Sequence, residues 1–479
     1  MRMVLDRQST QPVYQQIRDH LQQLITTGAL SSGERLPSIR TLARSLQVNK
    51  LTVLEAYGLL EAEGLVSARQ GSGYFVDQML SAPVQPSTFA PNQDVVVCNS
   101  RSRTFLYTYD QSILAHDCQS VIDLSCSFPA SPPPELQRIC RRMAASADQL
   151  FSYDAVQGQT LLRQQIAQLL LQRGIQTSCE DLLITNGSMQ GLWLNFQYFL
   201  KPGDWVVVES PTFQGALSIL EQLDVRLIGI PMTSEGINLE LLEQYLHSHA
   251  PKLIYTISTL HNPTGLTTSL QHRQQLLDLA QRYQCPILED NAYEGLNFEP
   301  VPPPLKGIDT RGWVTYLGTF SKTLLPGARV GYLAAPACHY KDLLERKLLC
   351  DLHTPTFTQA VISEYLASGH YRRHLTRLQS QYRHHRNVML QALETYFPQE
   401  ASWTVPAGGM YLWVQLPNSI QVDEICWQAA AAQVLVVNGL GLFPGQQGYP
   451  ALRLAYSKCS PEGIEKGIAI LGELLKQAL

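Results

Sequence analysis

The run GTFSKTLLPGARVG, from Gly318 to Gly331, places Lys322 among hydroxyl side chains, with Arg329 seven residues further on. A lysine amine can form a Schiff base with an aldehyde, and hydroxyls beside an arginine suit a phosphate dianion. Taken alone, Lys322 is better interpreted as a surface lysine that follows a strand. The pattern of the surrounding chain therefore decides the interpretation.

Short apolar, strand-like runs alternate with helix-like runs from about residue 121 onward. Examples are Asp181–Thr185, Trp205–Glu209, Lys252–Thr256 and Pro286–Asp290, each followed by a glycine or proline turn and then a helical pattern. This alternation predicts an α/β domain with a mainly parallel sheet, whose functional residues lie at the carboxyl ends of strands. From about Tyr340 the pattern is helix-rich and then mixed, which predicts a smaller C-terminal subdomain.

Candidate ligands follow these strands. Asp290 ends an apolar strand, where a buried carboxylate needs a cationic partner such as a protonated pyridine nitrogen. Tyr293 and Asn262 could donate to the phenolic oxygen of the same ring, although the NPTG run after His261 is also a common turn composition. Gly187 and Ser188 open a helix, whose free N–H groups suit a phosphate.

Two further residues fit the same site. Phe213, in a Pro-Thr-Phe run, could stack on the ring, but an ordinary core phenylalanine is a real alternative. Arg453 is a charge inside the apolar run Ala451–Leu454, so it needs a carboxylate partner, either a structural acid or a substrate. Each motif is weak alone, but together they describe one site for pyridoxal 5′-phosphate (PLP) centred on Lys322.

The first part of the chain has a different pattern. Helical spacing predicts a first helix after Gln11, and a second and a third helix that begin near Pro37 and Lys50. Short strands around a glycine-containing turn follow, up to Asp77. This is the order of a winged helix, whose third helix enters the major groove of DNA. The alternative is the solvated face of a dimerisation bundle. The expected DNA contacts are Arg35, Ser38, Arg40, Arg44, Asn49, Lys50, Thr52, Arg69 and Gly71.

Composition narrows the remaining possibilities. The net charge of −4 gives no global sign of nucleic acid, so DNA binding must come from local charge. The ten cysteines include no CxxC pair and no cluster with metal-ligand spacing, so we expect reduced thiols and no metal. Because no apolar run has the length of a membrane span or resembles a signal core, we expect a soluble cytoplasmic protein.

Residues 11–77 resemble the GntR family of winged-helix regulators. The matching residues are Leu36–Arg40, Leu42, Ala43, Leu46–Asn49, Thr52, Val53, Ala56, Tyr57, Leu60, Gly64 and Gly71–Val76. Lys50 departs from the arginine that the family often has, which keeps the charge but loses bidentate reading of guanine. The resemblance implies binding to double-stranded DNA.

Residues 121–475 resemble the fold type I (class I/II) aminotransferase family through the motifs given above. The cofactor-binding set that this implies is Lys322, Asp290, Tyr293, Asn262, Gly187, Ser188, Phe213, Thr319, Ser321, Arg329 and Tyr153. In that set Lys322, the catalytic residue, forms the aldimine with PLP, and Tyr153 reaches the phosphate of a partner subunit. Arg453 clamps the carboxylate of an amino acid substrate or effector.

We therefore expect a multi-domain chain. It has an α+β winged helix-turn-helix at residues 8–77, a linker at 78–119 and an α/β fold type I aminotransferase-like domain at 120–479. Within the latter we expect a large subdomain at about 150–340 and a small one at about 341–479. The order of the domains resembles the MocR subfamily of PLP-dependent transcriptional regulators, which implies a head-to-tail homodimer.

The function that we expect is regulation of transcription by a DNA-binding protein that senses PLP or an amino compound through Lys322. The alternative is an active aminotransferase with an appended DNA-binding domain. Its support is the spacing of Asp290 and Tyr293, which lacks the acidic pair directly before the tyrosine that many such regulators have. Val156 is a second departure from the subfamily's pattern, because it stands where a proline is frequent. A third possibility is a DNA-bridging dimer whose cofactor pocket stays empty.

Overall fold

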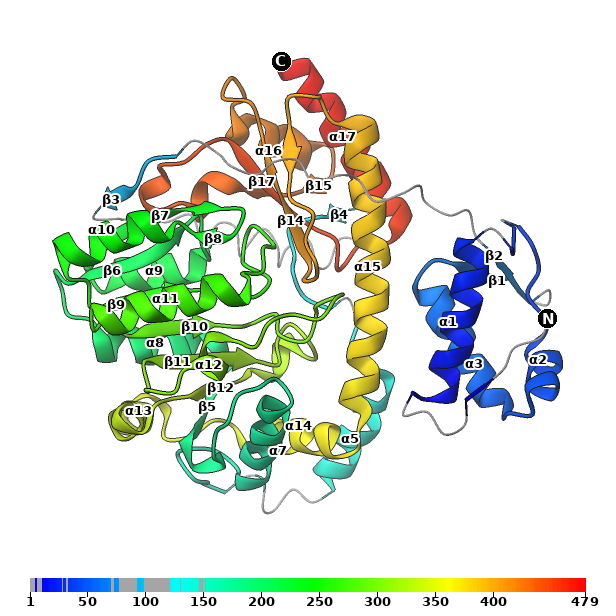
Figure 1. Ribbon diagram of the computed structural model, residues 1–479, viewed down its shortest axis with the longest axis horizontal. Coiled ribbons are helices and arrows are strands. Elements are labelled where there is room, and N and C mark those ends of the chain that lie inside the picture. Colours follow the sequence, from blue (N-terminus) through cyan, green and yellow to red (C-terminus); the bar gives the residue numbers. More distant parts are fainter. Residues whose placement is uncertain are drawn as a thin grey trace.

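The computed structural model describes residues 5–6, 11–27, 29–31, 33–69, 73–76, 93–98, 121–129, 131–145, 150 and 152–479. Gly71, one of the expected DNA contacts, lies outside these residues. Within them the chain forms a small N-terminal domain and a larger α/β domain that ends in a C-terminal subdomain (Figure 1). The multi-domain organisation predicted from the sequence is confirmed.

The N-terminal domain has the predicted order of helix, helix-turn-helix and hairpin. Its elements are α1 (Val13–Thr26), α2 (Ile39–Leu46), α3 (Lys50–Ala62), β1 (Val66–Arg69) and β2 (Gly73–Val76). The side chain of Ser38 caps α2 by accepting a hydrogen bond from Thr41 N, and that of Asn49 caps α3 by accepting one from Leu51 N. These caps and the left-handed Gln47 end one helix and begin the next, which fixes the turn.

The large domain is built on one nine-stranded sheet. Its strands are β3 (Val96–Cys98), β5 (Leu182–Asn186), β6 (Trp205–Ser210), β7 (Arg226–Thr233), β8 (Gly236–Ile237), β9 (Leu253–Thr256), β10 (Ile287–Asp290), β11 (Val314–Thr319) and β12 (Val330–Ala334). The order is β3-β7-β6-β9-β10-β11-β12-β5, and β8 pairs with β7. The pairings from β7 through β11 are parallel, whereas β12 is antiparallel to both of its neighbours.

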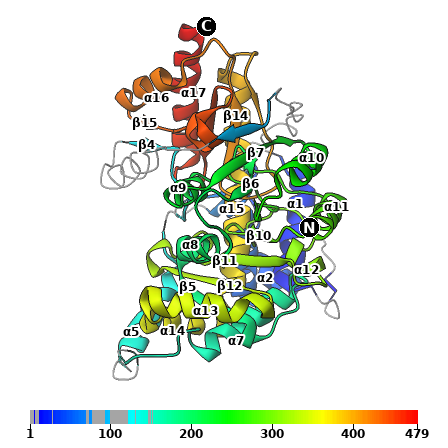
Figure 2. The same ribbon diagram turned by 90° about the vertical axis from the view of Figure 1, so that its left-hand side faces the viewer.

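Helices cover both faces of this sheet. They are α5 (Pro134–Ala144), α7 (Thr160–Leu171), α8 (Gly187–Phe199), α9 (Gln214–Gln222), α10 (Leu239–His249), α11 (Leu270–Arg282), α12 (Leu305–Ile308), α13 (Ala337–Asp351) and α14 (Thr356–Ala367), with short 3-10 turns at Cys179–Asp181 and Pro326–Ala328. In β6, Val207 packs toward α10 and α11, whereas Val206 and Val208 pack toward α8 and α9. Strands that are buried on both faces explain the continuous apolar runs of the sequence. Figure 2 shows the strands between these two helical layers.

The edge strand β3 comes from the stretch that we expected to link the domains. Its residues Val96–Cys98 pair antiparallel with Leu227–Gly229 of β7. The segment at 93–98 is thus part of the large sheet. Residues 77–92 and 99–120, on either side of it, lie outside the described range.

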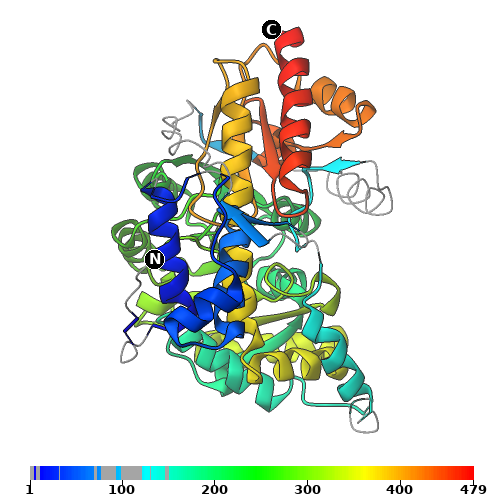
Figure 3. The same ribbon diagram turned by 90° about the vertical axis from the view of Figure 1, so that its right-hand side faces the viewer.

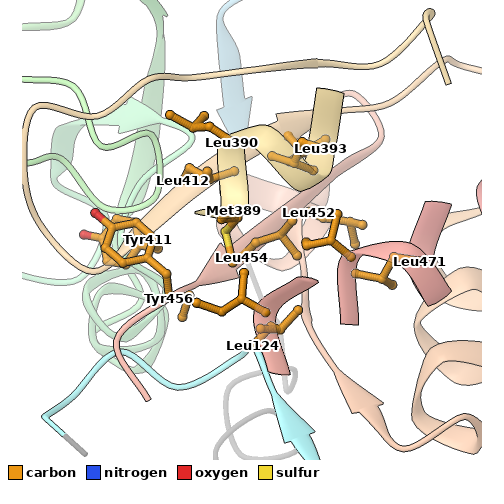
Figure 4. Packing of buried hydrophobic residues seen from close by; sticks show 14 of the residues in the cluster. Leu124, Met389, Leu390, Leu393, Tyr411, Leu412, Leu452, Leu454, Tyr456 and Leu471 are labelled. Carbon is orange, nitrogen blue, oxygen red and sulfur yellow. The ribbon is translucent and has the colours of Figure 1, made fainter. Parts of the chain in front are cut away.

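The C-terminal subdomain is a four-stranded antiparallel sheet covered by helices. Its elements are α15 (His370–Tyr396), β13 (Ser402–Trp403), β14 (Tyr411–Gln415), α16 (Val422–Ala431), β16 (Val437–Asn438), β17 (Ala451–Ala455) and α17 (Pro461–Ala478), with 3-10 turns at Gly439–Leu442 and Pro444–Gln446. Two short strands, β4 (Ile122–Asp123) and β15 (Val434–Leu435), pair beside it. Figure 4 shows Leu412, Leu452 and Leu454 of the sheet packed against Met389 of α15 and Leu471 of α17.

The winged helix lies against α15. The carboxylate of Glu63, just after α3, pairs with Arg18 at 2.6 Å and accepts a hydrogen bond from the Ser380 hydroxyl of α15 at 3.3 Å. Gly64 leaves room for the His384 ring, since a Cβ there would clash with it. Figures 1 and 3 show α15 as a long helix between the winged helix and the rest of the molecule. Within the described residues, no helix combines the length and the apolar character that a membrane crossing needs.

Candidate cofactor site and DNA-binding surface

Most of the predicted cofactor residues lie at one edge of the large sheet. Asp290 is the last residue of β10 and Thr319 the last of β11, and Asn262 and Phe213 follow β9 and β6. Gly187 begins α8 directly after β5. Because β12 runs antiparallel, its start beside Arg329 lies at the same edge. The site is therefore at the carboxyl ends of the parallel strands, where the alternating pattern predicts it.

The amine of Lys322 points into this edge. Its Nζ donates a hydrogen bond to the backbone oxygen of Ser127 at 2.9 Å and lies 5.7 Å from the centre of the Tyr293 ring. The Tyr293 hydroxyl is 3.5 Å from Ser127 Oγ. Lys322 is thus partly buried at this edge of the sheet, and its amine does not extend into solvent as that of the surface lysine suggested by the motif alone would.

Asp290 is buried, and only one of its carboxylate oxygens has a partner. Oδ2 accepts a hydrogen bond from the Tyr255 hydroxyl at 2.9 Å, and no atom of the described residues forms a hydrogen bond with Oδ1. Burial raises the pKa of Asp290 to about 6, and the Tyr255 hydrogen bond and the charge of Lys322 oppose that rise. A buried carboxyl with one open oxygen is the environment that a cationic ring nitrogen would complete. This orphaned oxygen fits PLP.

A cradle for a phosphate forms where α8 begins. Gly187 has a φ of 70°, and a Cβ at this position would clash with the Arg329 guanidinium. A Cβ at Gly331 would lie 2.9 Å from Ser188 N, so both glycines keep the start of α8 open. The first N–H groups of a helix have no intrahelical partner. Arg329 Nη1 also donates to Ser321 Oγ at 3.3 Å. The cradle combines backbone donors, a hydroxyl and a guanidinium, which fits a phosphate.

Arg453, in β17, reaches the same edge from the C-terminal subdomain. Its Nη1 donates to Asn262 Oδ1 at 3.1 Å, and its Nη2 donates to the Ser125 backbone oxygen at 3.0 Å. The guanidinium lies over the Tyr411 ring at 5.3 Å, and its buried Nε has no hydrogen-bond partner in the part of the chain that the structure describes. None of the ion pairs found among the described residues involves Arg453. Of the two partners that the sequence left open, a structural acid is thus not found beside Arg453 among the described residues.

Two predicted residues lie apart from these contacts. Phe213 caps the start of α9, and its ring fills the space above Gly215 beside Met189. Tyr153 is 85 % exposed, and its ring has an edge contact with His353 at 5.7 Å between centres. The structure of one chain therefore does not bring Tyr153 to the residues around Lys322.

Sequence reasoning missed three residues of the site. Tyr255 holds Asp290, Ser127 accepts from Lys322, and Tyr411 packs between Arg453 and Tyr293, whose ring centre is 5.1 Å away. A signal existed for Tyr255, because a polar-tipped residue in the middle of a buried apolar strand needs a partner. None existed for Ser127, which is 195 residues from Lys322 in sequence.

Most of the predicted DNA contacts are exposed residues of the helix-turn-helix. The exposed ones are Arg35, Ser38, Arg40, Arg44, Asn49 and Lys50, and Thr52 is half-buried. Arg69 ends β1, at the end of the hairpin that adjoins the turn. Ser38 and Asn49 also cap α2 and α3, so both residues have a structural role at the turn. Of the acids of α3, Glu61 accepts a hydrogen bond from Ala68 N, and Glu55 is exposed.

Comparisons with known proteins agree with this arrangement. Residues 120–471 match the model of aminotransferase class I and II, and residues 13–76 match that of the bacterial regulatory proteins of the gntR family. The chain is 31 % identical over 474 residues to YdfD of Bacillus subtilis (strain 168), an uncharacterized HTH-type transcriptional regulator, with 97 % of each chain covered. The chain is a MocR-type regulator. Members of this family join a GntR-type DNA-binding domain to a PLP-dependent aminotransferase fold.

Solved structures resemble the aminotransferase domain of this MocR-type regulator. The multiple substrate aminotransferase MsAT from Thermococcus profundus superposes with a TM-score of 0.72 at 34 % identity, covering 77 % of this chain and 94 % of its own. The α-aminoadipate aminotransferase LysN from Thermus thermophilus, in complex with N-(5′-phosphopyridoxyl)-L-leucine, gives 0.71 at 31 % identity, covering 78 % and 95 %. Both cover the domain that carries Lys322, and the cofactor of the regulator is therefore PLP.

Proposed function

We propose that this MocR-type regulator holds PLP on Lys322, binds an amino compound through Arg453, and transmits occupancy of that site to its DNA-binding domain through α15. One observation carries the proposal. The Tyr371 hydroxyl of α15 donates to Thr323 Oγ1 at 2.8 Å, next to Lys322, and Ser380 of the same helix contacts Glu63. A single helix thus touches the neighbour of the reactive lysine and the end of the recognition helix.

PLP, when bound, supplies an aldehyde for a lysine amine and an electron-withdrawing ring for an attached amino compound. In our proposal Asp290 keeps the ring nitrogen protonated, because a cation beside its buried, unpaired Oδ1 would stabilise the carboxylate. Asn262 accepts from Arg453 with its Oδ1, which leaves its Nδ2 free to donate to the ring oxygen together with Tyr293. Lys322 would take up and return protons at Nζ.

The remaining residues would position the ligands. Arg453 presents its charge beside Asn262, where an incoming carboxylate would complete its coordination. The phosphate would bind in the cradle made by Gly187, Ser188, Thr319, Ser321 and Arg329, and Phe213 would cover the ring.

DNA binding measured with and without ligands tests the coupling. Full-length protein would be titrated against fluorescent DNA from upstream of its own coding region, without PLP, with PLP, and with PLP plus each of a panel of amino acids. We expect at least one amino acid to change the dissociation constant several-fold, and Arg453→Gln protein to bind the same DNA without responding. Absence of DNA binding in every condition would contradict the regulator function. An equal response from Arg453→Gln would remove this arginine from the ligand site.

We also propose a homodimer, in which Tyr153 completes the partner's phosphate site. The support is an exposed apolar patch on and just after α13, beside the His353 that contacts Tyr153. It contains Leu348 at 42 %, Leu349 at 87 % and Leu352 at 50 % exposure. A cluster of this kind is typical of a protein interface. Light scattering should give twice the mass of the chain, and Leu349→Asp should shift it toward the monomer.

A head-to-tail arrangement is a further prediction that disulfide trapping can test. Glu63 and Ser380 are in contact, so the pair Glu63→Cys and Ser380→Cys should crosslink on mild oxidation. A crosslink between chains would run at dimer mass on a non-reducing gel and support the head-to-tail form. A crosslink that leaves the monomer mass would place each winged helix on its own chain. Each single cysteine variant is the matched control, because nine native cysteines among the described residues are free.

A second candidate function is catalysis of transamination. It is favoured by the geometry in which Lys322, Asp290, Asn262 and Arg453 meet at one edge, and by the similarity to aminotransferases such as MsAT. Single-turnover spectra with an amino acid test it. Conversion of the bound cofactor to its amine form would support transamination. A spectrum that shows binding of the amino acid but no later formation of the amine form would contradict it.

A further inference from the structure

The recognition helix α3 exposes two leucines on its outer side. Its buried side is formed by Val53, Ala56, Tyr57 and Leu60, as helical spacing requires. On the opposite side, Leu51 is 69 % exposed and Leu54 is 43 % exposed. Exposed leucines that are one turn apart at the start of a helix are costly in water, so this face needs an explanation beyond the fold of the domain.

The contact between α3 and α15 does not cover these leucines. That contact is made at the far end of the helix, by Glu63 and Gly64. Gly58, one turn beyond Leu54, is also open, because a Cβ there would meet no atom of the described residues within 4 Å. The outer side of α3 therefore exposes Leu51, Leu54 and Gly58 beside the exposed Glu55, and among the described residues it stays accessible while the domain rests on α15.

Three exposed cations belong to the same helix-turn-helix. Lys50 precedes Leu51, and Arg40 and Arg44 lie on α2, the preceding helix of the helix-turn-helix; all three are exposed. Exposed cations near exposed apolar side chains complement a double helix, whose phosphates border grooves that contain the bases. We propose that Leu51 and Leu54 read thymine methyl groups in the major groove. This inference rests on the DNA-binding function and adds to it the class of base that is read.

Leucine can distinguish thymine from cytosine because its side chain has no hydrogen-bond acceptor. In the major groove thymine offers a C5-methyl group, whereas cytosine offers an amine that needs an acceptor. A leucine side chain has no acceptor, so a cytosine amine against it would lose water without gaining a hydrogen bond. Burial of one methyl group is worth about 0.8 kcal/mol, which converts to about a fourfold change in affinity. The preferred DNA should therefore have thymines at the positions that α3 contacts.

Replacement of thymine by deoxyuridine tests the proposal without changing the protein. A duplex would first be enriched from a randomised library with the PLP-loaded, full-length protein. Each thymine of the enriched duplex would then be replaced in turn by deoxyuridine, which removes only the methyl group. We expect one or two positions per half-site at which affinity falls about fourfold.

Four variants, two of them controls, assign the effect to residues. Leu51→Ala and Leu54→Ala should bind the thymine duplex more weakly and lose the difference between thymine and deoxyuridine at their own position. Arg40→Ala should weaken both duplexes equally, since a phosphate contact does not sense the methyl group. Leu270→Ala, which alters a leucine of similar exposure (41 %) on α11, should leave both affinities unchanged.

The possible outcomes separate the inference from the function on which it rests. If the enriched duplex is bound but no deoxyuridine position matters, the methyl contact is wrong and DNA binding stands. If the leucine variants keep their methyl sensitivity but dissociate the dimer, the outer side of α3 is a protein interface and the proposal fails. If no sequence is enriched at any salt concentration, the DNA-binding function itself fails.

Discussion

The buried carboxyl of Asp290 predicts an unusual dependence of stability on pH when PLP is absent. The ordinary pKa of an aspartate is 3.8, and burial raises that of Asp290 to about 6. Because one pKa unit corresponds to about 1.4 kcal/mol, charging this group in the folded protein costs about 3 kcal/mol. The folded-state pKa lies above the unfolded one. The stabilisation is therefore complete below about pH 4 and is lost as pH rises through about 6.

Urea unfolding of cofactor-free wild type and of Asp290→Asn isolates this effect. Asparagine keeps an acceptor for Tyr255 and cannot be charged, so the pH dependence of all other groups cancels in the difference. All six tryptophans lie between Trp193 and Trp427, and their fluorescence therefore reports only on the aminotransferase domain.

Between pH 4 and pH 7 the wild type should lose up to about 3 kcal/mol relative to Asp290→Asn. With PLP bound, the difference should become independent of pH, because a ring cation would pair with the carboxylate. A flat difference in the cofactor-free proteins would refute the claim that Asp290 is held without a cation. A slope that persists unchanged with PLP would refute its pairing with the ring.

Three further substitutions probe the substrate, the phosphate and the coupling. Arg453→Gln should weaken binding of the amino compound about a hundredfold while PLP absorbance is retained, and calorimetry that shows equal affinity would refute the clamp. Gly187→Ala should raise the dissociation constant for PLP at least about tenfold, because its Cβ would clash with Arg329. An unchanged or lower dissociation constant in a PLP titration would show that the phosphate does not bind in this cradle. Tyr371→Phe, which removes the hydrogen bond to Thr323, should leave PLP binding intact and reduce the response of DNA affinity to the amino compound about fivefold. An unchanged response would remove α15 from the coupling.

Local sequence patterns predicted much of this site because its residues end strands. Asp290 and Thr319 follow apolar runs of strand length, and the carboxyl ends of parallel strands meet at one edge. The winged helix was also predictable, since Ser38 and Asn49 cap successive helices and mark the turn between them. In both cases the signal is contained within a few neighbouring residues.

The contacts that sequence could not predict join distant segments. Ser127 and Lys322 are 195 residues apart, and Glu63 and Ser380 are 317 apart. No periodicity relates such pairs, because tertiary packing alone brings them together. The strand at Val96–Cys98 is a similar case, since its pairing with β7 at the edge of the sheet stabilises a segment whose own pattern resembles a linker.

The central claim is that Lys322 holds the cofactor, and reductive trapping measures it most directly. Full-length protein loaded with PLP would be treated with borohydride, digested, and examined by peptide mass spectrometry. The account predicts one modified peptide, the one that contains Lys322, and a colourless Lys322→Ala protein that binds PLP only reversibly. A phosphopyridoxyl group on any other lysine, or a Lys322→Ala protein that remains yellow after dialysis, would contradict it.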